Sequence, residues 1–297
     1  MKQKTGRIGL LIVAIIWGSG FVASAIALNS FAPTQILALR FTLAFLISLL
    51  VFRKDIKEIK VPEIKKGGAI GVFLFLAFLF QTIGLQYTTA SKNAFLTATN
   101  IVIVPFLSWV ILRKKVSRNS FLGALVTLVG IGFLSGDGLT LGSINLGDAL
   151  TLVCAIFFAL QIFYTDFFVK DIKPGIIMIA QMGTAAMLSW VTVFFSSETT
   201  FYINGETILP ILYLGIISTL LAYGIQTWSQ KYVGSSESAV ILSTEAFFGM
   251  MASVIILNEQ ITTPMIIGAA LIFIGILIVE IKPSNKNVLT QEQIQRR

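Results

Sequence analysis

The 297-residue sequence contains no histidine, a single cysteine and few charged residues, which make up only 12% of the chain. Without histidine, the sequence has no Ser-His pair for nucleophilic catalysis and no His-Glu-x-x-His zinc motif. It also lacks a Gly-x-x-x-x-Gly-Lys-Ser/Thr phosphate loop, which argues against ATP-driven work within this chain. The lone cysteine, Cys154, excludes a disulfide framework inside the chain. These absences disfavour an enzyme, and the sequence predicts neither a cofactor nor a bound metal.

Hydrophobic residues make up 56% of the chain, and the mean hydropathy is +0.87. Soluble domains carry about 25% charged residues, twice the share found here. A bilayer core about 30 Å thick requires about 20 apolar residues per spanning helix. The composition therefore predicts an all-α integral membrane protein whose main partner is the lipid bilayer. Ten apolar segments can be cut from the sequence: 8–28, 34–52, 67–86, 92–112, 119–136, 146–168, 174–195, 208–229, 237–257 and 264–281.

Lysine and arginine are concentrated on alternate connectors between these segments. Twenty of them lie in the N-terminus, the even-numbered connectors and the C-terminal tail, whereas the odd-numbered connectors hold only Lys92. The remaining basic residue, Arg40, lies inside segment 34–52. Cytoplasmic loops carry an excess of basic residues, so both termini are predicted to be cytoplasmic and the protein to lie in the cell membrane. The net charge of +8 is explained by this asymmetry, and no nucleic-acid partner is predicted.

An internal repeat organises the chain. The stretch from Tyr87 to Phe133 recurs without a gap as Tyr232 to Ile278, and eleven of its 47 positions are identical. A second offset, of 141 residues, places Pro33 on Pro174. A repeat of this length requires a structural explanation.

The repeat divides the chain into two five-helix units, 8–136 and 146–281, followed by a cytoplasmic tail at 282–297. Because five is odd, the second unit enters the membrane from the opposite side. We therefore expect ten transmembrane helices in two inverted repeats around a central cavity. Many secondary transporters have this architecture, with the substrate site near the bilayer midplane.

Two charged residues lie within predicted spans. Placing a charged side chain in the hydrocarbon core costs free energy, so such residues usually have a functional role. Arg40 could face a polar cavity and bind a carboxylate, or it could extend to the interface or tie to backbone carbonyls. Glu245 is the only acid deep within a predicted span. A carboxylic acid in this position suits a proton carrier that couples transport. The alternatives are a permanent partner for Arg40 and a hydrogen-bonded neutral acid.

Further polar and aromatic residues are predicted to line the same path. Asn93, Thr97 and Asn100 follow the i, i+4, i+7 spacing of one helix face, and Asn100 is the repeat mate of Glu245. Such a lining suits an amphipathic organic solute, although any single member could equally join two helices. The other predicted lining residues are Trp17, Gln81, Gln161, Tyr164, Gln181 and Gln226.

Glycine residues predict close packing of two segments, and a proline predicts a kink in a third. Gly123 and Gly130 in segment 119–136 recur as Gly268 and Gly275 in segment 264–281. Glycines on one face allow close helix contact, so these two segments are expected to pack tightly against other helices. Pro105 is expected to kink segment 92–112.

The order of the motifs along both halves resembles the EamA family of the drug/metabolite transporter superfamily, over about residues 8–281. Each motif is short, and the specificity lies in their order and spacing. The motifs that carry the resemblance are Ile16-Trp17-Gly18-Ser19, Leu39-Arg40-Phe41, Ala90-Ser91-Lys92-Asn93-Ala94-Phe95-Leu96-Thr97, Val104-Pro105, Gly147-Asp148, Thr244-Glu245, Asn258-Glu259 and Gly268-Ala269-Ala270-Leu271-Ile272.

The resemblance implies ten helices in two inverted repeats, and export or uptake of amino acids, related metabolites or drugs by a secondary mechanism. Two positions depart from the family pattern. Ala246 stands where similar proteins often have proline after the glutamate. Glu259 has Lys114 as its repeat mate, where relatives often keep an acid.

The function expected from the sequence is export of a small-molecule substrate by alternating access, with proton coupling through Glu245. An uncoupled facilitator and an importer remain open alternatives within the transporter class. A non-transporting membrane sensor or assembly subunit is the second class. A homodimer is also left open.

Overall fold

The structure, a computed structural model, describes residues 2–113, 118–135, 145–196, 200–201 and 205–280. Every regular element in these ranges is helical, as the composition predicts. The predicted tail at 282–297 lies outside the described residues. The elements are α1 (Lys2–Ala27), α2 (Pro33–Val51), α3 (Arg53–Ile56), α4 (Val61–Leu85), α5 (Ala90–Ala98), α6 (Asn100–Leu112), α7 (Arg118–Ser135), α8 (Leu146–Phe168), α9 (Pro174–Phe195), α10 (Gly205–Leu212), the π-helix η1 (Tyr213–Leu221), α11 (Ala222–Gln230), α12 (Ser235–Ser243), α13 (Glu245–Leu257) and α14 (Thr263–Glu280).

Local sequence explains where several helices begin. Pro33 and Pro174 are the first residues of α2 and α9, where the missing proline N–H costs no helical hydrogen bond. Thr89 caps α5 by accepting a hydrogen bond from the backbone N–H of Lys92 at 3.3 Å. Asn145 caps α8 in the same way and is 2.8 Å from the backbone nitrogen of Asp148.

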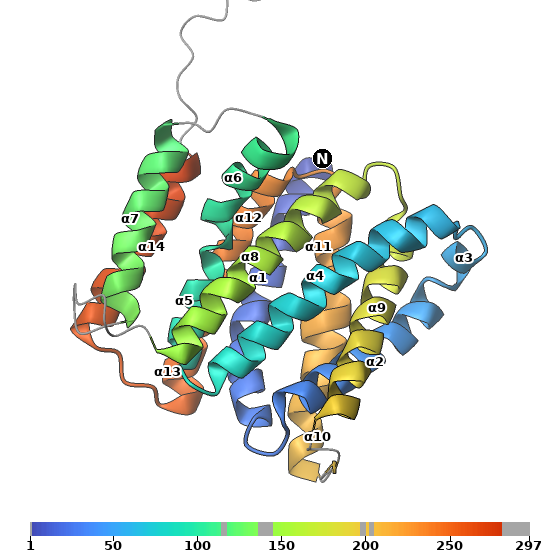
Figure 1. The fold of residues 1–297 in the computed structure, drawn as a ribbon, viewed down its shortest axis with the longest axis horizontal. Coiled ribbons are helices and arrows are strands. Elements are labelled where there is room, and N and C mark those ends of the chain that lie inside the picture. The colour runs from blue at the N-terminus through green and yellow to red at the C-terminus, as the bar shows by residue number, and fades with distance from the viewer. Residues whose placement is uncertain (1, 114–117, 136–144, 197–199, 202–204, 281–297) are drawn as a thin grey trace, which may run out of the picture.

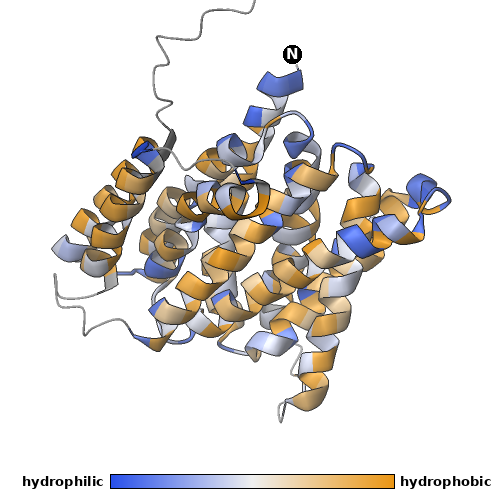
Figure 2. Cartoon of the chain, turned by 45° about the horizontal axis from the view of Figure 1, so that its top comes forward, coloured by the Kyte–Doolittle hydropathy of each residue, from blue (hydrophilic) through white to orange (hydrophobic). Residues whose placement is uncertain are grey.

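In the part of the chain that the structure describes, eight helices are long and apolar enough to cross a membrane. Two further apolar stretches, Phe121–Leu134 in α7 and Thr263–Ile278 in α14, are shorter. Figure 2 shows hydrophobic residues along most of each helix, with hydrophilic residues gathered towards helix ends and connectors. This distribution is the one expected for helices that expose their sides to hydrocarbon.

Two of the predicted segments are each broken into two helices. Segment 92–112 is interrupted at Thr99, between α5 and α6, and segment 237–257 is interrupted at Thr244, between α12 and α13. The break in the first of these precedes Pro105, which lies inside α6. A third predicted segment, 208–229, contains the π-helix η1 between α10 and α11.

Helices α7 and α14 lie side by side at one edge of the molecule (Figure 1). Gly130, Gly268 and Gly275 lie where the two helices approach each other closely. A Cβ atom at Gly268 would lie 2.5 Å from the backbone nitrogen of Leu134, and one at Gly130 would lie 2.8 Å from that of Ile272. The prediction that these glycines permit tight helix packing is therefore confirmed, and the absence of side chains is what allows the contact.

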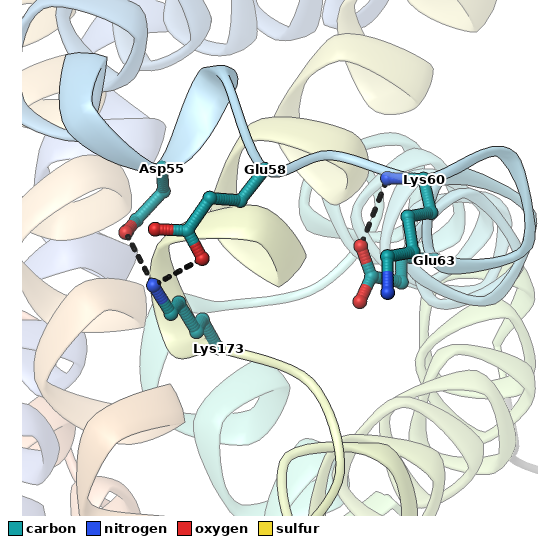
Figure 3. A network of polar contacts seen from close by, with 5 residues as sticks. All are labelled: Asp55, Glu58, Lys60, Glu63 and Lys173. Atoms are coloured by element: carbon teal, nitrogen blue, oxygen red, sulfur yellow. Dashed lines mark hydrogen bonds and ion pairs between the residues drawn. The ribbon is translucent and has the colours of Figure 1, made fainter.

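The connector between α2 and α4 is tied to the start of α9 by surface charges (Figure 3). Lys173 donates a hydrogen bond to Glu58 at 2.5 Å and lies 3.8 Å from Asp55. The hydrogen bond to Glu58 raises the pKa of Lys173 above its usual 10.5. Nearby, the backbone N–H of Lys60 donates a hydrogen bond to the carboxylate of Glu63 at 2.9 Å. This contact lies at the start of α4. These contacts join the two halves of the chain at one end of the bundle.

Candidate functional site

A small cavity lies at the centre of the bundle and has a volume of about 30 Å³. One buried water needs about 10–15 Å³ of such space, so the cavity has room for only a few waters. Its walls come from helices far apart in sequence, including both broken helices. The lining residues are Trp17, Gly20, Phe21, Ser24, Arg40, Phe78, Gln81, Thr97, Asn100, Phe158, Gln161, Ile162, Ser218, Tyr223, Leu242 and Glu245.

Arg40 reaches this cavity from α2 and is only 1% exposed. Its Nε donates a hydrogen bond to the hydroxyl of Thr219 at 3.0 Å. Its guanidinium carbon lies 4.0 Å from the centre of the Phe78 ring, a cation–π contact. Among the described residues no carboxylate lies within ion-pair distance of Arg40. The positive charge is thus held by an aromatic ring and a hydroxyl, and an anion in the cavity could pair with it.

Glu245 reaches the cavity from the first residue of α13 and is 4% exposed. Within the described part of the chain, its carboxylate accepts no hydrogen bond and forms no ion pair. The alternative that Glu245 is a permanent partner of Arg40 is therefore not realised in this conformation. A buried acid without a partner is costly, and such residues in membrane proteins usually serve ion or substrate pathways.

Aromatic side chains form much of the cavity wall, and one of them, Phe78, contacts Arg40. Trp17 and Tyr223 lie with their ring centres 4.8 Å apart, and Phe78 and Phe158 meet edge to face at 5.1 Å. Phe78 also contacts Tyr223, with ring centres 6.0 Å apart. These rings create an apolar wall beside a charged one, so the site suits a solute with both kinds of surface.

The π-helix η1 supplies polar groups to the same site. Trp17 donates its indole N–H to the backbone carbonyl of Ser218 at 3.0 Å. The Thr219 hydroxyl that accepts from Arg40 donates in turn to the carbonyl of Leu214 at 2.6 Å. π-Helical segments free backbone groups from regular pairing and occur often at functional sites. The apolar sequence of this segment gave no signal of the π-helix.

Two further polar atoms at the cavity have no hydrogen-bond partner among the described residues. These are the Tyr223 hydroxyl and the Asn100 side-chain oxygen. Gln81 and Thr97 are paired with each other at 3.1 Å. Buried polar groups are nearly always satisfied by protein, water or ligand, so the free atoms point to a polar occupant.

A chain of amides lies directly behind the cavity wall. Gln226 donates to Gln161 at 3.3 Å, and Gln161 donates to Gln181 at 3.5 Å and to Thr165 at 3.2 Å. Gln161 alone of these four lines the cavity. The others orient it, so a change in α9 or α11 would reach the site through this chain.

The structure thus separates the predicted lining residues into two groups. Trp17, Arg40, Gln81, Thr97, Asn100, Gln161 and Glu245 line one cavity, whereas Asn93, Tyr164, Gln181 and Gln226 lie outside it.

The residues outside the cavity have other contacts. Asn93 donates to Thr151 at 2.9 Å and to the carbonyl of Gln81 at 3.2 Å. Tyr164 stacks on Phe73, with ring centres 5.5 Å apart. Asn93 and Thr97 lie on the same helix α5, but only Thr97, one turn closer to the break at Thr99, lines the cavity. Spacing alone therefore did not reveal which members of the predicted polar face share the cavity.

Sequence reasoning did not identify several aromatic and hydroxyl members of the wall. Phe78, Phe158 and Tyr223 are ordinary residues of apolar segments, and nothing in their spacing distinguishes them from 24 phenylalanines and six tyrosines in the chain. Ser24 and Ser218 are small polar residues in apolar surroundings, which was the one signal available. Their place in the site depends on how the helices cross.

A half-buried carboxylate lies at a helix end, apart from the cavity. Glu259, in the turn between α13 and α14, accepts hydrogen bonds from the backbone N–H and the hydroxyl of Ser91 at 3.2 and 2.9 Å. It also accepts from the Ser253 hydroxyl. Ser91 lies in the first turn of α5, where a negative charge is favoured by the helix dipole. Glu259 therefore fastens the α13–α14 turn to the start of α5.

Comparisons with known proteins agree with this picture. The EamA-like transporter family matches residues 4–136 and again residues 145–281. An uncharacterized transporter of Archaeoglobus fulgidus is 35% identical over 282 residues, which cover 95% of this chain and 88% of the relative. A probable amino-acid metabolite efflux pump of Escherichia coli K12 is 25% identical, with 94% and 95% of the two chains covered.

A solved crystal structure of a protein has a similar fold. It superposes with a TM-score of 0.69 at 15% identity and covers 93% of this chain and 97% of its own. At this identity the likeness concerns the fold alone. Since the family matches nearly the whole sequence and the helices are apolar and long, this chain belongs to the EamA-like transporter family and is a multi-pass membrane protein.

Proposed function

We propose that this protein exports small organic metabolites, such as amino acids, related compounds or drugs, across the cytoplasmic membrane by a secondary mechanism. The observation that carries the proposal is that Arg40 and Glu245 share one buried cavity, each without an ionic partner among the described residues. Unpaired charges in a membrane protein are expensive to keep, and transport of a charged solute is a function that requires them.

Each wall of the cavity has a proposed role. Arg40 binds an anionic group of the substrate, and Trp17 with the neighbouring aromatic rings covers its apolar part. Glu245 is the coupling carboxylate, which carries a proton between the two sides of the membrane. Gln81, Thr97, Asn100 and Gln161 hydrogen-bond the substrate along its path.

Alternating access explains why the cavity is small. A site for a metabolite has a volume of about 300–1,000 Å³, far above the 30 Å³ of this cavity. The described conformation is therefore proposed to be closed around the centre, and the helices must move apart to admit a substrate. Asn93, Tyr164, Gln181 and Gln226 are proposed to join the path when they do so.

The proposed architecture has ten transmembrane helices in two inverted repeats, 8–136 and 146–281, with both termini in the cytoplasm. The family match to two successive stretches of similar length supports the division. The twenty basic residues in the two termini and the even-numbered connectors support the orientation. The efflux pump among the relatives supports export over uptake.

Untargeted mass spectrometry of the growth medium tests the proposal. Cells overproducing the wild type, Glu245→Gln, or an empty vector are compared. Glu237→Gln is the matched control, because Glu237 is an exposed acid on α12 that pairs with Arg7. We expect one or more metabolites to accumulate outside with the wild type and the control, but not with Glu245→Gln. A medium identical to that of the empty vector in all cases would contradict export.

A further inference from the structure

A lateral groove of about 530 Å³ lies between α13 and α14, and α1 and α5 each contribute one residue to its lining. It is distinct from the central cavity and shares no lining residue with it. Its walls are almost wholly apolar. The lining residues are Leu11, Phe95, Ser243, Thr244, Ala246, Phe247, Phe248, Met250, Ile266, Ala269, Ala270, Ile272, Phe273 and Ile276.

The two hydroxyl groups at the groove are already satisfied by their own helix. Ser243 donates to the carbonyl of Val240 at 2.7 Å, and Thr244 donates to that of Ile241 at 2.6 Å. The groove therefore presents no polar group that demands a partner. Apolar walls of this kind favour an apolar occupant, so hydrocarbon is the ligand chemistry that fits this groove.

The groove opens onto the outside of the helix bundle. Phe247, Phe273 and Ile266 on its rim are exposed by 52%, 43% and 57%. Because α13 and α14 belong to the apolar stretches of a multi-pass membrane protein, these rim residues face lipid. The occupant can enter sideways from the bilayer.

The length of the groove fits a single lipid chain. On α14 it extends from Ile266 to Ile276, ten residues that span about 15 Å at the helical rise of about 1.5 Å per residue. The hydrocarbon core of a bilayer is about 30 Å thick, so about 15 Å is the depth filled by the chains of one leaflet.

The groove and the central cavity are separated by one turn of the broken helix. Ser243, Thr244 and Ala246 face the groove, whereas Leu242 and Glu245 face the cavity. A chain lying in the groove supports this turn from the lipid side. Its presence would therefore resist movement of the segment that carries Glu245.

We propose that the groove between α13 and α14 is a binding site for one acyl chain of a membrane glycerolipid. The site depends on the membrane location of the helices and not on which solute the protein moves. An experiment that refutes the lipid site would therefore not refute the proposed export, and the reverse also holds.

Photolabelling in reconstituted vesicles tests this site. The probe is a phosphatidylethanolamine with a diazirine near the end of one acyl chain, mixed into phosphatidylcholine vesicles that contain the full chain. Ala270→Trp fills the groove from an exposed position, and Ile274→Trp adds the same side chain to the exposed face of α14 outside the groove. Labelled positions are mapped by peptide mass spectrometry.

We expect labels on α13 and α14 residues of the groove in the wild type and in Ile274→Trp. In Ala270→Trp this labelling should fall by at least about tenfold, the change that corresponds to losing contact with two methylene groups. Equal labelling of the two variants, or labels spread evenly over the exposed faces of α7 and α14, would overturn the proposal. Retention of detergent or another apolar solute in place of phospholipid would overturn the assignment of the occupant.

Discussion

The two broken helices are alike in geometry and different in chemistry. At Thr99, between α5 and α6, the backbone angles φ and ψ are −65° and −10°, and at Thr244, between α12 and α13, they are −64° and −11°. Each threonine hydroxyl donates to the carbonyl three residues earlier, at 2.6 Å in both cases. The next residue lines the central cavity in both, but it is Asn100 in one and Glu245 in the other.

The two breaks have the same local feature but supply different residues to the cavity. Pro105 follows the first break, but Met250 stands at the repeat-equivalent position after the second, so a proline is not required. The shared threonine and its bond to the preceding turn accompany both breaks. The position after the break then determines whether the cavity receives a neutral amide or an ionisable acid.

Exchanging the ionisable residue is expected to have the largest effect. In Glu245→Gln, the dependence of transport on a proton gradient should be lost, because an amide cannot carry a proton. Asn100→Leu, at the matched position, should retain that dependence and weaken apparent affinity about fivefold, for a lost hydrogen bond of about 1 kcal/mol. Transport into vesicles at several pH gradients measures both. Glu245→Gln with a wild-type rate at every pH would refute the coupling role.

Removing the positive charge of Arg40 is expected to have the next largest effect. Arg40→Gln should raise the half-saturation concentration of an anionic substrate by about 10- to 100-fold, since a hydrogen bond to a charged group contributes about 1.5–3 kcal/mol. Gln181 occupies the repeat-equivalent position but lies outside the cavity. Gln181→Leu should change the same constant by less than about fivefold, the value of one neutral hydrogen bond. A similar rise of the half-saturation concentration in both variants would contradict a special role for Arg40 in binding the substrate.

The repeat-equivalent residues that follow the two broken helices also differ in the sequence. Glu259 fastens one turn to α5, whereas its repeat mate in the other half is Lys114. Glu259→Ala should lower the free energy of unfolding by about 0.5–2 kcal/mol, as for loss of a helix cap. Lys114→Ala should have no such effect, because a lysine side chain has no oxygen with which to accept from backbone N–H groups. Denaturant unfolding in detergent micelles provides the measurement, and equal losses would argue against the cap.

Substituting Thr99 and Thr244 tests whether the two helix breaks have the same cause. Thr99→Val and Thr244→Val should each lower the free energy of unfolding by about 1 kcal/mol, the usual worth of one internal hydrogen bond. Because the two sites have no shared partner, the double variant should show the sum. A large effect at one site only would show that the breaks have different causes. The same unfolding titration serves for all three variants.

The smallest effect is expected where the halves meet at the surface. Lys173→Gln should leave the unfolding midpoint unchanged, because Lys173 is exposed and its ion pairs with Glu58 and Asp55 are screened by water and salt. The pKa of Lys173 is raised in the folded protein, so the contribution is complete below pH 10.5 and is lost as the pH rises through the folded value. A clear change in the midpoint between pH 6 and 9 in Lys173→Gln relative to wild type would contradict this.

Much of the arrangement followed from local sequence. The apolar runs located the helices, and the glycine pairs marked two segments for close packing, which the structure shows to be α7 and α14 against each other. These features depend on neighbours in the chain or on the size of one residue. The breaks at Thr99 and Thr244 did not follow, because threonine in an apolar segment is compatible with an unbroken helix.

The central cavity was predictable only in part. Arg40 and Glu245 could be identified because charge in an apolar segment is conspicuous at the level of sequence. Tyr223, Phe78 and the π-helix could not, because they become a site only through their neighbours from other helices.

The sequence by itself determined the helical class, the family and the charged residues available for function, since hydropathy, repeat and motif are properties of the linear chain. Only the tertiary structure decided which side chains share the cavity, that Arg40 and Glu245 have no ionic partner among the described residues, and that a lipid-facing groove lies behind the second break. The physical reason is that helix crossing and packing set which residues from distant segments meet, and no local pattern encodes those distances.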